Sequence, residues 1–163
     1  EKPFKPFRGF KRFLTKKPIA QKLIKQMETT KEKNHVITNC VDQLESIKEL
    51  YRNYKEAEAQ KDWEAREKIV EQAHEEALSV EFRSGWVTNS EEMKTEEFKI
   101  LLSTGGPACQ IIGELDHYNQ PINIEIQYQD WYQPWKTLLT SPEKCKIDNQ
   151  ALLWFCECFY FGE

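Results

Sequence analysis

The spacing of apolar residues changes near Leu78, and this change constrains the fold more than any other feature of the chain. Before residue 78, apolar residues recur every three or four positions, which is the period of an α-helix. After residue 78 they alternate with polar residues, as Val80 and Phe82 do around Glu81, which is the period of a β-strand. The sequence therefore predicts an α+β fold in which helices precede an antiparallel sheet.

The helical part predicts an antiparallel hairpin of two helices, with one continuous helix over residues 36–78 as the alternative. The first helix has an apolar stripe of Ile37, Cys40, Val41, Leu44, Ile47, Tyr51 and Tyr54. The pattern pauses at residues 58–63, where Asp62 is of a residue type that caps helix N-termini. The stripe of the second helix consists of Trp63, Ile69, Val70, Ala73 and Ala77. We expect the hairpin to cover one face of the sheet.

The strands are predicted at residues 79–87, 97–103, 109–115 and 122–129. The last of these alternates cleanly, with Ile122, Ile124, Ile126 and Tyr128 on one side. Short connections between them predict a four-stranded antiparallel meander with one covered and one solvated face. Residues 148–163 predict a buried C-terminal helix capped by Asp148, with a core strand as the alternative, because short apolar runs do not separate the two.

Charge divides the chain into a basic arm and an acidic body. Residues 1–33 hold eleven Lys or Arg and three Glu, whereas residues 34–163 hold twelve basic and twenty-four acidic side chains. We therefore expect residues 1–33 to form a basic arm with a short helix that begins at Pro18 and ends at Thr29 and Thr30. Residues 34–163 are expected to form a single α+β domain, helical over 34–78 and with the sheet and C-terminal helix over 79–163.

Both charged segments are candidate binding surfaces. In the arm the candidates are Lys5, Arg8, Lys11, Arg12, Lys16 and Lys17. These cations are interleaved with phenylalanines, so the arm could bind nucleic acid, with the cations on phosphates and the rings stacked on bases. The alternatives are that the arm docks on the chain's own body or binds a protein partner. In the helical hairpin the candidates are Glu56, Asp62, Glu64, Glu67, Glu71 and Glu75. Such a row of carboxylates is either a solvated face or a mimic of nucleic acid that occupies a basic groove.

The sequence gives no sign of an enzyme or a cofactor. The pair Gly105–Gly106 lacks the lysine and the following helix of a phosphate-binding loop, and therefore predicts a hairpin turn. A nucleophile elbow and a zinc-protease motif are also missing. Glu67, Glu71 and His74 have a spacing that could hold a metal, but a solvated helix face is the better interpretation. We expect no catalytic residues and no metal.

Three further features bear on the environment of the chain. Its five cysteines are scattered and odd in number, which favours reduced, mostly buried thiols in a cytosolic protein. The longest apolar run is far too short to span a membrane, and no apolar segment typical of a signal peptide follows the basic N-terminus. Trp131, Tyr132 and Trp135 follow the last strand, where aromatic residues are either lids on the core or contacts for a partner.

Several blocks of the sequence resemble a known group of proteins. They are SVEFRSGW, EEFKILLSTGGPA, GELD, QDW, PW and FYFGE, within residues 79–163. These blocks resemble a widespread family of small proteins of phages and mobile elements that includes anti-CRISPR proteins against the type V-A effector nuclease. The resemblance implies a cytoplasmic protein of a bacterial host cell that binds an RNA-guided effector nuclease stoichiometrically and blocks its action. The alternative is a phage-encoded nucleic-acid-binding or host-takeover regulator that acts through the basic arm.

Overall fold

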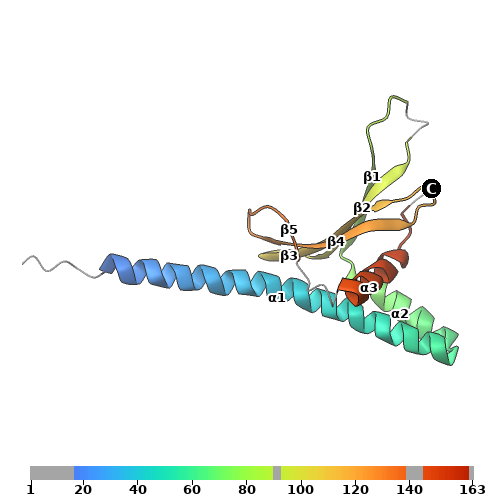
Figure 1. Ribbon diagram of the computed structural model, residues 1–163, viewed down its shortest axis with the longest axis horizontal. Helices are drawn as coiled ribbons and strands as arrows, with labels where there is room; N and C mark the ends of the chain where they lie inside the picture. The colour runs from blue at the N-terminus through green and yellow to red at the C-terminus, as the bar shows by residue number, and fades with distance from the viewer. Residues whose placement is uncertain (1–16, 90–92, 139–144, 162–163) are drawn as a thin grey trace, which may run out of the picture. The chain divides into compact units, whose positions relative to one another are not determined.

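A computed structural model describes residues 17–89, 93–138 and 145–161, with only the backbone described for residues 17–34 and 145–148 (Figure 1). The helices are α1 (Lys17–Gln60), α2 (Trp63–Glu76) and α3 (Cys145–Glu157). The strands are β1 (Ser79–Ser84), β2 (Thr95–Ser103), β3 (Pro107–Leu115), β4 (Pro121–Asp130) and β5 (Lys136–Thr137). The contacts divide the chain into two compact units, Glu1–Glu32 and Lys33–Glu163. The second unit carries the sheet.

The sheet is an antiparallel meander in which neighbouring strands follow the order of the chain, β1-β2-β3-β4-β5. The predicted α+β class and meander are therefore confirmed. The number of strands was wrong, because the two residues of β5 pair with Gln127 and Tyr128 after a tight turn. Two residues are too few to show an alternating pattern in the sequence.

The helical hairpin is also confirmed, and the continuous helix over residues 36–78 is wrong. At the end of α1, Lys61 N–H donates to Glu58 O and Asp62 N–H donates to Ala57 O, at 3.1 and 3.0 Å. This pair of bonds is a Schellman motif, with Lys61 at φ 58° in the position that usually holds glycine. Asp62 then caps α2 as expected, since its side chain accepts a hydrogen bond from Ala65 N–H.

The start of α1 differs from the prediction. The helix does not end at Thr29 and Thr30 but runs without a break from Lys17 to Gln60. Threonine lowers helix propensity by only about 0.7 kcal/mol or less per residue. No glycine or proline follows Pro18 within the helix, so nothing in this stretch is strong enough to stop it.

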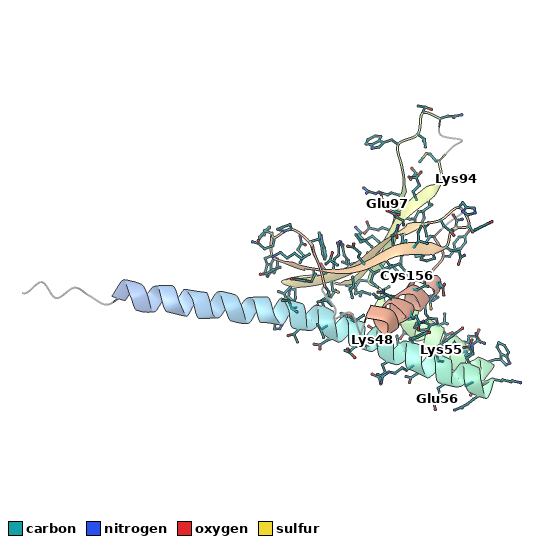
Figure 2. The ribbon with its side chains drawn as sticks, in the orientation of Figure 1. Lys48, Lys55, Glu56, Lys94, Glu97 and Cys156 are labelled. Carbon is teal, nitrogen blue, oxygen red and sulfur yellow. The ribbon has the colours of Figure 1, made fainter. Side chains whose placement is uncertain are left out.

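The core of the second unit lies between the helices and one face of the sheet (Figure 1). Its buried residues from the helices are Cys40, Leu44, Ile47, Leu50, Ala73, Ala151, Leu152, Trp154, Phe155 and Cys156. Those from the strands are Phe98, Ile100, Leu102, Cys109, Ile111, Leu115 and Ile126. Figure 2 shows Cys156 on the side of α3 that faces the sheet. The C-terminal run is thus a helix, as predicted, but it begins before Asp148, which therefore does not cap it.

Two residues of α1 that were predicted to face the core, Ile37 and Val41, do not; their chain neighbours Val36 and Cys40 are buried there. The buried stripe follows Val36, Cys40 and Leu44, so Ile37 and Val41 lie at its flank with 38% of their surface exposed. Val36 and Cys40 are apolar and four residues apart, and so are Ile37 and Val41. Helical periodicity alone therefore could not decide which pair is buried.

A β-bulge changes which side chains of β4 point toward the core. The register between β3 and β4 shifts after Ile112, and Asn123 has a φ of 50° at this point. A bulge adds one residue to a strand and so reverses the alternation on one side of it. Ile122, expected on the covered side with Ile126, is therefore on the opposite face and 40% exposed.

Candidate functional site

The exposed face of α2 carries three of the candidate carboxylates. Ala73 is buried against the core, and Ile69 and Val70 are partly buried. Glu67, Glu71 and Glu75 are exposed and four residues apart, so they lie on one face of the helix. We call these three residues the acid stripe. At 1.5 Å rise per residue they span about 12 Å of helix.

The cations of α2 do not neutralise the acid stripe. Lys68 Nζ pairs with Glu64 at 2.7 Å. The Arg66 guanidinium donates to the hydroxyl of Tyr54 and lies over the rings of Tyr54 and Trp63, 4.8 Å from each centroid. Among the described residues, no hydrogen bond or ion pair engages the three stripe carboxylates, so their charges face solvent together.

The acid stripe works against the stability of its own helix. Like charges at i,i+4 destabilise a helix by about 0.2–0.5 kcal/mol per pair, and the stripe contains two such pairs. Glu75 also lies in the last turn of α2, where the helix dipole disfavours negative charge. Helix stability therefore does not explain why these positions are acidic.

The other three predicted acidic residues have local roles. Asp62 is the N-cap of α2, and Glu64 is both paired with Lys68 and placed in the first turn, where negative charge is favourable. Glu56 belongs to α1, and its carboxylate accepts a bond from Gln60 Nε2 at 3.4 Å. Figure 2 shows Glu56 on the side of α1 away from the sheet. The six candidates therefore do not form one continuous group.

Several contacts hold α2 in place beneath the stripe. Ser46 of α1 donates to Glu76 at 3.0 Å. His74 Nε2 lies 2.6 Å from Cys158 O, and its ring packs on Phe159 with centroids 5.1 Å apart. His74 thus connects α2 to the segment after α3. Within the described ranges, no group of three or more His, Cys, Asp or Glu residues is arranged to hold a metal.

The glycine pair joins β2 to β3, as the hairpin prediction requires. Gly105 has a φ of 119°, which glycine adopts readily. Gly106 is needed for another reason: a Cβ there would lie 2.6 Å from Nε1 of Trp131. The pair therefore turns the chain between β2 and β3 and allows the indole to pack against the hairpin tip.

Trp131 and Tyr132, which we call the aromatic turn, are not lids on the core. Their side chains are 62% and 95% exposed, and Tyr132 has a φ of 55°. A bulky residue rarely adopts this left-handed conformation. The turn is held by Gln133 N–H, which donates to Asp130 O at 2.8 Å, and by Gln129 Nε2, which donates to Gln133 O at 2.7 Å. The turn thus leaves both aromatic side chains largely exposed, with the Trp131 indole against Gly106.

The sheet face opposite the helices is hollowed, a feature that the sequence analysis missed. The hollow has a volume of about 890 Å³ and is lined by charged residues of β1 to β4. Arg83 pairs with Glu97, and Lys99 pairs with Glu81 at 2.7 Å across β1 and β2. Figure 2 shows Glu97 on the sheet. The sequence does show that charged residues flank Phe82 in β1 and Phe98 in β2, and this alternation was the available sign of a charged sheet face. Both cations among the described lining residues, Arg83 and Lys99, are therefore paired.

Of the basic-arm candidates, the structure describes one, and only its backbone. Lys5, Arg8, Lys11, Arg12 and Lys16 lie outside the described residues. Lys17 is the first residue of α1, and only its backbone is described.

None of the helices in the described ranges combines the length and the apolar character that crossing a membrane requires. Comparisons with models of protein families, with curated protein sequences and with solved structures found no match.

Proposed function

We propose that this protein is a stoichiometric inhibitor that binds an RNA-guided effector nuclease, and that the acid stripe of α2 is a principal contact. The observation that carries the proposal is the group of three exposed carboxylates, Glu67, Glu71 and Glu75, without a cationic partner among the described residues. The resemblance of sequence blocks within residues 79–163 to a family of phage and mobile-element proteins that includes anti-CRISPR proteins suggests the class of target.

The chemistry of the stripe fits a groove that normally holds nucleic acid. Such a groove presents lysines and arginines to phosphates, and carboxylates at regular spacing attract the same cations. The stripe belongs to a helix that is capped by Asp62 and fixed through Ser46 and His74. The backbone that carries the stripe is therefore already ordered, and the conformational entropy lost on binding is mainly that of the three side chains.

A titration tests the proposal. A guide-loaded type V-A nuclease is held at a fixed concentration far above the dissociation constant, and cleavage is measured as the protein is added. The proposal predicts that inhibition is complete near one protein per nuclease. A wild-type protein that leaves cleavage unchanged would refute the function, and complete inhibition at far lower ratios would indicate an enzyme that acts on the nuclease.

Two variants locate the contact. In the stripe variant Glu67, Glu71 and Glu75 are replaced by Gln. In the matched control the exposed residues Asp42, Glu49 and Glu157 are replaced by Asn, Gln and Gln, which gives the same change in net charge. We expect inhibition to be lost only in the stripe variant. Equal inhibition by both variants would exclude the stripe as the contact.

The alternative regulator function is tested alongside. Deletion of residues 1–17 removes the cationic candidates of the arm, and binding of the intact protein to bare DNA and RNA is measured at increasing salt. A steep loss of binding with salt that disappears on deletion would favour the regulator. Full inhibition by the deleted protein would show that the arm is dispensable for inhibition.

A further inference from the structure

Two cysteines that are far apart in the sequence meet in the core. Cys40 of α1 and Cys109 of β3 are fully buried, and their Sγ atoms lie 2.9 Å apart across a sequence separation of 69 residues. Cys40 Sγ is also 3.8 Å from the carbonyl oxygen of Gln127. Both thiols are free. This contact joins helix α1 to strand β3 of the sheet.

We propose that Cys40 and Cys109 form an intramolecular disulfide when the chain meets a low-molecular-weight disulfide such as oxidised glutathione. Their side chains already point at each other, and closing the distance from 2.9 Å to the bond length of about 2.05 Å needs a small displacement. This inference stands apart from the proposed function, since neither cysteine belongs to the acid stripe.

The other two cysteines whose side chains the structure describes, Cys156 and Cys158, do not offer an equivalent pair. Cys156 and Cys158 are two residues apart at the end of α3, where such neighbours do not face each other. The thiol of Cys158 lies 3.3 Å from the carbonyl oxygen of Trp154, and burial raises the pKa of Cys158 to about 12. The Cys158 thiol thus donates to the backbone of α3.

The reaction is a two-step thiol–disulfide exchange. The thiolate of Cys109 attacks one sulfur of oxidised glutathione, and one glutathione leaves as a thiolate. Cys40, after losing its proton to water, attacks the Cys109 sulfur of the mixed disulfide and expels the second glutathione. Two protein thiols and one oxidised glutathione thus give one protein disulfide and two reduced glutathiones. The protein loses two electrons, and the two protons end on the glutathiones.

Burial determines when this exchange takes place. The hydrogen bond with Cys40, and then burial, raise the pKa of Cys109 far above its usual value. In the native state, where both thiols are buried, the exchange is therefore slow. The disulfide forms while the chain folds, or when local unfolding exposes the two thiols. Once formed, it is shielded from reductants for the same reason. The bond would fix α1 to β3 covalently.

The test uses the full chain, unfolded in denaturant and refolded in a buffer of oxidised and reduced glutathione. Free thiols are then alkylated, and the protein is digested with trypsin for mass spectrometry. We expect the peptide that contains Cys40 to be linked to the peptide that contains Cys109. Because the disulfide closes a loop of 69 residues, we also expect the melting temperature to rise by about 10 °C relative to the reduced protein.

Matched variants separate this bond from general oxidation. Cys109→Ala should abolish the rise in melting temperature, while Cys158→Ala should retain both the linked peptides and the rise. The wild-type protein carries the test even if a variant fails to fold. Folded wild-type protein with other cysteine pairings, with no linked peptides at any glutathione ratio, or with a lower melting temperature when linked would overturn the proposal.

Discussion

Replacement of Lys61 by glycine should stabilise the protein. Lys61 joins α1 to α2 at φ 58°, and both its N–H and that of Asp62 bond back to α1. The left-handed conformation costs a residue with a Cβ about 1–2 kcal/mol. Glycine avoids this cost but adds about 0.4–1 kcal/mol of conformational entropy to the unfolded chain. The net expectation for Lys61→Gly is a gain of about 0.5–1 kcal/mol in the free energy of unfolding.

This effect is measured by urea unfolding at constant pH and salt, with a rise in melting temperature of about 1–4 °C as a second readout. Lys61→Ala keeps the Cβ and removes the same charge, so its stability should stay within about 0.5 kcal/mol of wild type. Asp62→Ala removes the N-cap of α2 and should lose about 1 kcal/mol. A Lys61→Gly protein that is less stable than Lys61→Ala would refute the geometry assigned to this turn.

Three further substitutions test the loops at the ends of the sheet. Gly106→Ala places a Cβ against Trp131 and should cost about 1–3 kcal/mol in the urea-unfolding assay, and a Trp131→Ala background should remove most of this cost. Tyr132→Gly relieves a left-handed tyrosine and should gain about 0.5–1 kcal/mol, so a loss there would refute the strain. The carboxylate of Asp116 accepts hydrogen bonds from backbone N–H groups, and these bonds, that of Gln120 most strongly, lower the pKa of Asp116. The stabilisation that the charged carboxylate provides should therefore be lost as pH falls through the lowered pKa. Asp116→Asn should therefore make stability less dependent on pH in acid, and an unchanged acid dependence would contradict this assignment.

The elements that the sequence predicted correctly are those with a long, single periodicity. The helices on both sides of Asp62 and the four longer strands each repeat their pattern several times, so local signals and tertiary packing agree. Asp62 was recognisable as a cap because its side-chain chemistry acts over three residues. The hairpin turn at Gly105 was recognisable for a similar reason, since its conformation is local.

The parts that were missed depend on contacts between distant segments. Ile122 changes face because of a bulge at Asn123, and an unbroken alternation in the sequence gives no warning of it. The contact between Cys40 and Cys109 follows from the packing of α1 on β3. Within the candidate site, the sequence identified the acidic segment but did not separate the acid stripe from residues with structural roles. That distinction required the positions of Lys68 and Arg66.

The most direct measurement of the central claim is the affinity of the stripe variant for the guide-loaded nuclease, compared with that of the matched control. The three carboxylates of the acid stripe are expected to meet cations, and losing three such contacts should weaken binding on the order of 100-fold or more. Binding should also become less sensitive to salt in the stripe variant than in the control. Dissociation constants within about threefold of each other, with the same salt dependence, would contradict the assignment of the acid stripe as the binding surface.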